Sequence, residues 1–214
     1  RAPVRFVLGN HDYDIAEADR PGLLERLGLG QGFYAFTEGS WRFVVLNGDE
    51  LAFNSPKDAG LEREAAAMYA ALLAAKRPNA TKWNGGIGRA QMAFLEDELS
   101  TADRKGLSAV VLCHFPVHPP AAHNLWNDGE VVARLESHPS VKAYFAGHNH
   151  DGGLAVKNGI VYLTFAGLVE TSSDGLHRSR IRYLNLEVVE PDGAWRRRRR
   201  SHPRPGVHAE MVVV

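Results

Sequence analysis

Histidine and asparagine side chains follow short apolar runs at three places in this 214-residue sequence. The three motifs are Gly9-Asn10-His11-Asp12, then His114, and finally Gly147-His148-Asn149-His150. Each comes directly after a run with the composition of a buried strand. Because ligands collect at the carboxyl ends of the strands in an open α/β sheet, we expect the three motifs to meet at one edge of a sheet.

These side chains could together bind a divalent metal ion. If the segment 147–150 is extended, His148 and His150 point the same way, because side chains alternate along a strand. Imidazoles and an amide oxygen in one place suit borderline metals such as manganese, iron or zinc. Taken singly, Asn10 could cap a turn and His114 could be a half-buried histidine. Their occurrence at three strand ends favours the metal site.

The motifs resemble the second half of the signature of the calcineurin-like metallophosphoesterases. In that family the pattern is Gly-Asn-His-Asp, a later histidine at a strand end, and Gly-His-x-His. The resemblance implies that Asn10, His114 and His148 bind one metal ion and that His150 binds a second. It therefore implies two divalent ions as cofactors, with manganese expected and iron or zinc as alternatives.

The same resemblance implies a mechanism. In the complete family site, two divalent ions clamp the phosphoryl oxygens and activate a hydroxide that attacks phosphorus in line. His11 would stay off the metals, orient the phosphate and protonate the leaving oxygen. Asp12 matches the acidic position after that histidine and would have a supporting catalytic role.

The sequence departs from the family pattern at its N-terminal end. The family's Asp-x-His and Gly-Asp-x-x-Asp motifs precede Gly-Asn-His-Asp, and neither occurs here. The motifs that are present supply most ligands of one ion and a single ligand of the other. We therefore expect an N-terminally truncated domain, such as a fragment or a partial gene product. An inactive remnant that serves only as a binding domain is one alternative.

Further segments resemble one subfamily, the manganese-dependent ADP-ribose/CDP-alcohol diphosphatases. They are Asn84-Gly85-Gly86, His114-Phe115-Pro116-Val117, Leu125-Trp126-Asn127, the glycines after His150, and Gly167-Leu168-Val169-Glu170-Thr171. This resemblance implies hydrolysis of phosphoanhydride bonds in nucleotide conjugates. A phosphomonoesterase or a cyclic-nucleotide phosphodiesterase of the same fold is the other alternative.

Substrate contacts are expected near the metal ligands. Trp83, Phe115 and Trp126 lie in loops beside the motifs and could stack on a nucleobase, although for any single one of them packing below the surface is the commoner case. Of these, Trp126 is our candidate for a substrate-binding residue. Asp151 and Gly152 directly follow the third motif, where a glycine would let a bulky diphosphate approach closely.

The elements that must position these residues alternate along the chain. Strands are expected at 4–8, 33–37, 41–47, 108–113, 141–146, 160–165 and 179–189, and helices at 21–27, 56–76, 90–99 and 130–138. This order predicts an α/β domain with a partly parallel sheet and an antiparallel edge. The family resemblance implies that this domain is a layered metallophosphoesterase-type β-sandwich flanked by helices. We expect the domain to span 1–195, followed by a basic segment at 196–214.

Composition limits the partners. Lys plus Arg and Asp plus Glu both number 25, while 196–214 alone contains six Arg and one Glu. Because no aromatic platform accompanies these arginines, we expect a solvated edge rather than a nucleic-acid site. No apolar stretch is long enough to span a membrane, and the N-terminus does not resemble a signal peptide. The single cysteine, Cys113, fits a reducing compartment, so we expect a cytoplasmic protein. The expected partner is a small nucleotide conjugate, the substrate. The sequence gives no signal for an oligomeric state.

Overall fold

The computed structural model describes residues 5–167 and 211–213 of the chain. The strand expected at 179–189 and the arginine-rich segment 196–200 lie outside the described residues. The same holds for the boundary expected between residues 195 and 196 and for most of the segment 167–171.

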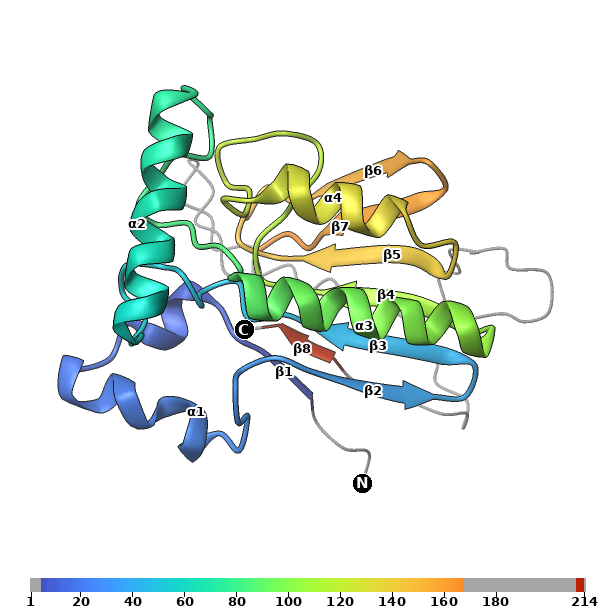
Figure 1. Ribbon diagram of the computed structural model, residues 1–214, viewed down its shortest axis with the longest axis horizontal. Coiled ribbons are helices and arrows are strands. Elements are labelled where there is room, and N and C mark those ends of the chain that lie inside the picture. The colour runs from blue at the N-terminus through green and yellow to red at the C-terminus, as the bar shows by residue number, and fades with distance from the viewer. Residues whose placement is uncertain (1–4, 168–210, 214) are drawn as a thin grey trace, which may run out of the picture. The chain divides into compact units, whose positions relative to one another are not determined.

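A six-stranded mixed sheet forms the centre of the fold (Figure 1). Its strands, in spatial order, are β2 (Tyr34–Glu38), β3 (Trp41–Val45), β4 (Ser108–Leu112), β5 (Val141–Ala146), β7 (Ile160–Thr164) and β6 (Gly153–Lys157). The four central strands are parallel, and β2 and β6 pair antiparallel with their neighbours at the two edges. The predicted α/β fold with a partly parallel sheet is confirmed.

A separate two-stranded sheet pairs β1 (Arg5–Val7) with β8 (Met211–Val213). The strand expected before Gly9 therefore forms, but it does not join the six-stranded sheet. The prediction that all three motifs follow strands of one sheet is wrong for the first motif. The first motif must therefore reach the other two from outside the six-stranded sheet.

The hairpins at the edges follow from local turn chemistry. Between β6 and β7, Asn158 and Gly159 have φ angles of 50° and 80°. Two successive residues with positive φ make the type I′ turn that Asn-Gly sequences favour, because this turn matches the twist of the strands. The sequence Asn158-Gly159 by itself predicts a tight hairpin, and this prediction is confirmed. The connection between β2 and β3 is also two residues long and uses Gly39, with φ 56°.

Four α-helices and two short 3-10 helices occur in the described residues. They are η1 (Asn10–Tyr13), η2 (Glu17–Gly22), α1 (Leu23–Arg26), α2 (Ala59–Ala74), α3 (Arg89–Lys105) and α4 (Asp128–Glu136). The helix expected at 21–27 is only one α-helical turn, preceded by η2, which contains Pro21. In the part of the chain that is described, none of these helices combines the length and the apolar character that crossing a membrane requires.

Helix ends explain the differences from the expected bounds. Asp58 caps α2, since its Oδ1 accepts hydrogen bonds from the backbone N–H groups of Gly60 and Leu61. α3 continues six residues beyond the expected Leu99 and ends at Gly106, whose φ of 64° is the left-handed conformation of a helix C-cap. The apolar periodicity identifies the buried face of a helix, and the cap residues decide where the helix stops.

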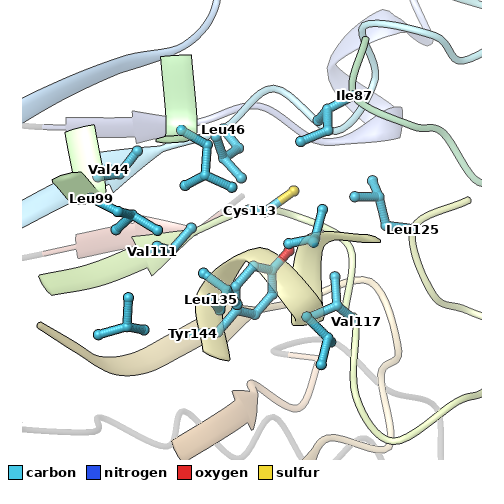
Figure 2. Packing of buried hydrophobic residues seen from close by; sticks show 14 of the residues in the cluster. Val44, Leu46, Ile87, Leu99, Val111, Cys113, Val117, Leu125, Leu135 and Tyr144 are labelled. Atoms are coloured by element: carbon cyan, nitrogen blue, oxygen red, sulfur yellow. The ribbon is translucent and has the colours of Figure 1, made fainter. Parts of the chain in front are cut away.

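The main core lies between the six-stranded sheet and the helices α3 and α4, which cross the same face of the sheet in Figure 1. Leu95 and Leu99 of α3 and Leu135 of α4 are fully buried. Figure 2 shows this packing around Val111 of β4 and Tyr144 of β5. Each large apolar side chain buried in this way contributes about 1.5–3 kcal/mol to folding.

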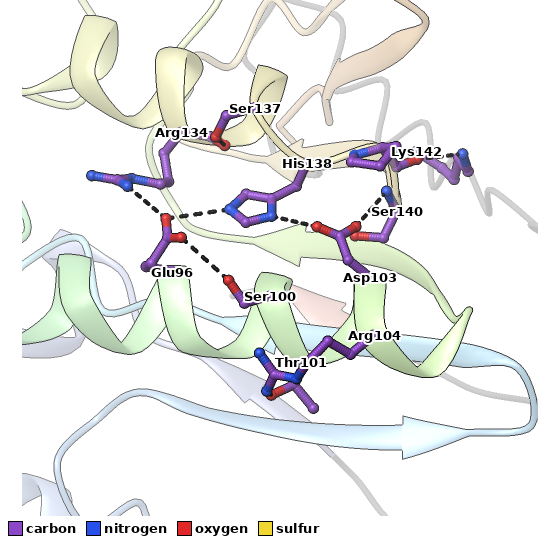
Figure 3. A network of polar contacts seen from close by, with 11 residues as sticks. Glu96, Ser100, Thr101, Asp103, Arg104, Arg134, Ser137, His138, Ser140 and Lys142 are labelled. Carbon is purple, nitrogen blue, oxygen red and sulfur yellow. Dashed lines mark hydrogen bonds and ion pairs between the residues drawn. The ribbon is translucent and has the colours of Figure 1, made fainter.

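A polar network joins α3 to α4 and to the loop that follows it (Figure 3). His138 contacts Asp103 Oδ2 through Nδ1 at 2.6 Å and Glu96 Oε2 through Nε2 at 3.2 Å. Arg134 of α4 also donates to Glu96, and the backbone N–H of Ser140 donates to Asp103. The carboxylates of one helix therefore fix the position of the segment that enters β5.

Candidate metal centre

Two parallel neighbouring strands position His114 and His148. β4 and β5 are parallel neighbours, with Leu112 opposite Phe145 at their ends, and both motif segments begin directly after these strands. Beyond the strand ends, the backbone N–H of Gly147 donates to His114 O at 2.8 Å. The two imidazoles, 34 residues apart in sequence, are therefore held side by side by the backbone.

The side chains of Asn10, His114 and His148 converge on one point and form a candidate metal site, the metal cluster. His114 Nε2 lies 2.9 Å from Asn10 Oδ1 and 3.2 Å from His148 Nδ1. The expected meeting of the three motifs is thus seen in the geometry, with Asn10 supplied by η1. Gly9 makes the approach of η1 possible, because a Cβ at this residue would lie 2.6 Å from His114 Nδ1.

The third motif is not extended. His148 has a left-handed φ of 64°, and the backbone N–H of Asn149 donates to Gly147 O at 2.7 Å. The expectation that His148 and His150 alternate along an extended segment is therefore wrong. A non-glycine residue with positive φ is strained, and such strain persists where surrounding contacts hold the residue. His148 turns toward the metal cluster, whereas His150 is exposed.

Burial keeps the two clustered imidazoles neutral. Desolvation, with smaller contributions from His11 and His150, lowers the pKa of His114 to about 4. Desolvation and the neighbouring histidines, His114 first among them, lower the pKa of His148 to about 3. A neutral imidazole offers a nitrogen lone pair, which a metal ligand requires. Both rings therefore have the ionisation state of metal ligands at neutral pH.

Asn84 orients His148 and was not assigned a role from the sequence. His148 Nε2 donates to Asn84 Oδ1 at 3.0 Å, which leaves the lone pair of Nδ1 facing His114 and Asn10. Asn84 Nδ2 in turn donates to the backbone carbonyls of Ala122 and Asn79. The amide thus fixes the tautomer and the direction of the His148 ring. The only feature of the sequence that pointed to Asn84 was its place in the Asn84-Gly85-Gly86 segment, which resembles the diphosphatase subfamily.

The other residues of the first motif have different surroundings. His11 is largely exposed, and its Nδ1 lies 2.7 Å from Asp14 Oδ2. Asp12 accepts a hydrogen bond from the backbone N–H of Gly9 at 2.8 Å and so closes the turn of η1. His11 is thus exposed with a carboxylate partner, and Asp12 holds the motif in shape.

A buried carboxylate lies near the acidic residues that follow Asn10. Asp49 is fully buried, and neither of its carboxylate oxygens has a hydrogen-bond partner. Burial, followed by the charges of Asp12 and Asp14, raises its pKa well above the ordinary value. Asp49 has no motif around it, and nothing in its local sequence shows that the residue is buried.

A pocket of about 500 Å³ opens beside the metal cluster. It is lined by aromatic, cationic and polar side chains, namely Phe53, Trp83, Arg20, Lys82, Asn10, Asp14 and Asn54. Asn10 belongs both to this pocket and to the metal cluster. A ligand in the pocket would therefore extend to the candidate metal site.

Trp126 does not line this pocket. It is 1% exposed, its Nε1 donates to Thr81 O, and its ring packs against Phe53 and Tyr69. The expectation that Trp126 stacks on a substrate is therefore corrected, because both the ring and its polar group are engaged inside the protein. Phe115 is likewise fully buried, whereas Trp83 is 56% exposed.

Asp151 and Gly152 follow the third motif at its exposed end. Asp151 is exposed, and its backbone N–H donates to Asn149 Oδ1 at 3.3 Å. Gly152 has a φ of 70°, and a Cβ there would lie 3.0 Å from the backbone of Ala166. The glycine is thus required by a turn that packs closely against the end of β7.

The donors present fit one divalent ion. Two neutral imidazole nitrogens and an amide oxygen are suitable ligands for manganese, iron or zinc. Within the described ranges, 5–167 and 211–213, no group of three or more His, Cys, Asp and Glu side chains is arranged to hold a metal. Asn10, His114 and His148 would therefore supply three ligands to a single ion.

Comparisons with known proteins agree with this geometry. The family model described as calcineurin-like phosphoesterase matches residues 1–152. A manganese-dependent ADP-ribose/CDP-alcohol diphosphatase of Xenopus laevis is 32% identical over 161 residues, which are 66% of this chain and 44% of that protein. The Oryza sativa protein of the same name is 30% identical over 78% of this chain and 58% of its own length.

A solved structure shares the fold. The crystal structure of a dimetal phosphatase from Danio rerio superposes with a TM-score of 0.66 at 28% sequence identity. The match covers 77% of this chain and 60% of the zebrafish chain. This chain thus spans about half the length of the curated relatives named above.

Proposed function

Because this chain belongs to the calcineurin-like phosphoesterase family, we propose that it is a metal-dependent hydrolase of phosphoanhydride bonds in nucleotide conjugates such as ADP-ribose and CDP-alcohols. The observation that carries the proposal is the metal cluster, in which Asn10, His114 and His148 converge with both imidazoles neutral. The names of the Xenopus and rice relatives support this choice of substrate.

The metal cluster would hold one divalent ion, with manganese the expected metal. His114 would bind through Nε2, His148 through Nδ1 and Asn10 through its amide oxygen, since these atoms face one another. A bound divalent ion supplies Lewis-acid polarisation of a phosphoryl oxygen and makes water a better nucleophile at neutral pH. His150, two residues after His148 in the third motif, is our candidate ligand for a second ion, because the family resemblance implies this role.

Two residues of the first motif would serve the chemistry at the leaving group. His11 would orient the phosphate and give a proton to the departing oxygen, and Asp14 at 2.7 Å holds the imidazole in position for this transfer. Asp12 would support His11 by closing the turn of η1. Asp151 and Gly152 would lie against the diphosphate, where the exposed turn offers space for a bulky substrate.

A substrate panel tests the proposed activity. The protein, supplied with manganese, is assayed on ADP-ribose, CDP-choline, cyclic AMP and p-nitrophenyl phosphate. We expect turnover of the first two substrates and at least tenfold lower kcat/KM on the others. A preference for p-nitrophenyl phosphate or cyclic AMP would show that the proposed substrate class is wrong, but it would not contradict the metal site. His114→Ala is the negative control, and His118→Ala, an imidazole that stacks on Tyr162, is the matched control.

A non-enzymatic role is the second candidate. It is favoured by the metal cluster itself, which within the described residues offers three ligands to one ion. In that case manganese would bind at one site per chain with no turnover of any substrate in the panel. Two tightly bound ions per chain, measured by elemental analysis after dialysis, would exclude this alternative.

The cellular location follows from the same proposal. Cys113 is a free, buried thiol, and burial raises its pKa to about 11. It packs as a small apolar side chain in the main core. We propose a cytoplasmic location, where a reduced cysteine and soluble nucleotide conjugates are both present.

A further inference from the structure

The pocket beside Asn10 carries two aromatic side chains that the metal chemistry does not require. Phe53 is 48% exposed and Trp83 is 56% exposed, and both line the pocket. Large aromatic side chains exposed together at a pocket mark a binding surface more often than chance exposure does. A flat ring that stacks on them would remove apolar surface from water on both sides of the contact.

The ring of Phe53 packs against two other aromatic side chains. Its ring makes edge contacts with Tyr69 at 5.1 Å and with the buried Trp126 at 5.2 Å between ring centroids. Trp126 is itself fixed by the hydrogen bond from Nε1 to Thr81 O. A ring supported in this way needs little further ordering when a ligand binds, so it is a preorganised platform.

Two cationic side chains share the pocket with these rings. Lys82 is exposed, and the Nε of Arg20 donates to Ile15 O at 3.3 Å, which anchors the side chain while its guanidinium stays charged. The pocket also contains Asp14, but its carboxylate already pairs with His11. The net charge of the lining residues therefore favours an anion, and phosphate oxygens are suitable partners for both cations.

Hydrogen bonds connect the pocket walls to the metal cluster. Asn54, the residue after Phe53, donates from Nδ2 to Asn10 O at 3.2 Å. Asn84, the residue after Trp83, contacts His148. Both aromatic residues thus lie one position away from a residue that is bonded to the metal cluster, so a ligand that stacks on them is held at a defined place relative to it.

We propose that this pocket binds the nucleoside monophosphate end of the substrate, with Trp83 and Phe53 stacking on the base and Lys82 and Arg20 contacting the phosphate. The inference rests on the proposed function, because it assigns one end of the nucleotide conjugate to a subsite of the same centre. It makes Trp83 the main determinant of selectivity for nucleotides over phosphates that lack a base.

Binding of two small probes tests the base contact. AMP and ribose 5-phosphate are titrated by calorimetry into the protein with manganese present. The parent should bind AMP about tenfold more tightly, the effect of stacking one base on an aromatic ring. Trp83→Ala should remove most of this preference, and Trp83→Phe should retain it. Equal binding of the two probes by the parent, or an unchanged preference in Trp83→Ala, would overturn the proposal.

Charge and surface controls complete the experiment. Lys82→Gln should weaken both probes by the same factor of about three to ten, because it removes a contact to phosphate and none to the base. Lys105→Gln at the exposed end of α3 and Leu154→Ala on β6, which is 71% exposed, should leave both affinities unchanged. If Lys105→Gln lowers the affinity for the probes as much as Lys82→Gln does, the effect comes from the overall charge of the protein and not from a contact with the phosphate. That result would contradict the assignment of Lys82.

Hydrolysis separates this inference from the proposed function. An AMP preference that depends on Trp83, in a protein that hydrolyses neither ADP-ribose nor CDP-choline, would support the pocket and reject the activity. Turnover of these conjugates with the same KM in the parent and in Trp83→Ala would support the activity and reject the pocket. Circular dichroism of each variant confirms that the fold is retained.

Discussion

At the residue scale, His148 depends on partners that come from distant parts of the chain. Its left-handed φ of 64° turns the ring toward His114, and Asn84 holds Nε2 at 3.0 Å. Hydrogen bonds to the outer nitrogen of a metal-binding imidazole fix its tautomer and orientation, and their loss typically costs 10–100-fold in metal affinity or activity. Asn84 is therefore a positioning residue, which acts on the metal site through His148.

Replacing Asn84 tests this dependence. Asn84→Ala removes the oxygen that accepts from His148 Nε2, so we expect manganese affinity to fall at least about tenfold in a calorimetric titration. Asn84→Asp keeps an oxygen acceptor and should retain more of the affinity. His118→Ala, on a histidine that packs on Tyr162 in the loop between β4 and α4, should have no effect. Parent-like affinity in Asn84→Ala would show that the contact does not orient the ligand.

At the element scale, the loop between α2 and α3 passes very close to the segment after β3. A Cβ on Gly85 would lie 2.2 Å from the backbone oxygen of Gly48 and 3.1 Å from the Ala52 side chain. Two backbone hydrogen bonds fix this passage, from Trp126 N to Gly85 O and from Leu51 N to Gly86 O. The close contact places the neighbouring Asn84 beside His148.

A methyl group at Gly85 should disrupt this passage. Because the nearest atom belongs to the backbone and cannot rotate away, we expect Gly85→Ala to lower the free energy of unfolding by about 3 kcal/mol in urea titrations. Gly129→Ala in the first turn of α4 is the matched control, since a Cβ there meets no atom within 4 Å. That variant should be unchanged or slightly more stable. Similar losses in both variants would contradict the role of the close approach.

The network between α3 and α4 makes stability depend on pH. Desolvation raises the pKa values of Glu96 and Asp103, but hydrogen bonds outweigh it and lower both below their ordinary values. The bonds come from His138 and Arg134 to Glu96, and from Ser140 and His138 to Asp103. As the pH falls, the unfolded state therefore takes up protons first. The stability contributed by these carboxylates is complete above the unfolded-state pKa values of about 4 and is lost as the pH falls through the folded-state values.

Neutral side chains at positions 96 and 103 should remove the contribution of these carboxylates to the pH dependence of stability. We expect the double variant Glu96→Gln/Asp103→Asn to be about 1–2 kcal/mol less stable than the parent at pH 7, because both carboxylates are partly exposed and solvent weakens their interactions. The difference should shrink at pH 3, measured by urea unfolding at both pH values. Asp97→Asn on the exposed face of α3 is the control. A difference that is the same at pH 7 and pH 3 would exclude the carboxylates as its source.

At the scale of the whole molecule, metal binding and folding should be linked. The metal cluster joins η1, the end of β4 and the end of β5, so an ion bound there stabilises only the folded chain. Manganese at 100 times its dissociation constant stabilises by about 2.7 kcal/mol. For a chain of this length, such a gain raises Tm by roughly 5–10 °C.

Thermal unfolding with and without manganese measures this linkage. Calcium, which prefers ligands that are all oxygen, should give a smaller increase in Tm, and a chelator should reverse the effect of manganese. His114→Ala should lose the increase, while His118→Ala should keep it. An equal increase in the parent and in His114→Ala would place the bound manganese elsewhere in the protein.

Local sequence was sufficient for several elements and for the positions of the motifs. The apolar runs at 108–113 and 141–146 predicted two buried strands, and Asn158-Gly159 predicted a hairpin, because burial on both faces and positive φ each require particular residue types. The family followed from the same motifs and is confirmed by the match over residues 1–152. Metal binding by these residues stays a prediction.

Contacts between loops were decided only by the tertiary structure. Asn84 and His148 are 64 residues apart, and Phe53, Trp83 and Asn10 reach one pocket from three segments. Local propensity does not specify such contacts, because each loop takes its conformation from the packing of the elements that it connects. The same packing placed Trp126 in the core and turned His148 out of the extended conformation. The sequence by itself therefore determined the family and the strand ends, whereas the folded chain decided which side chains face the site.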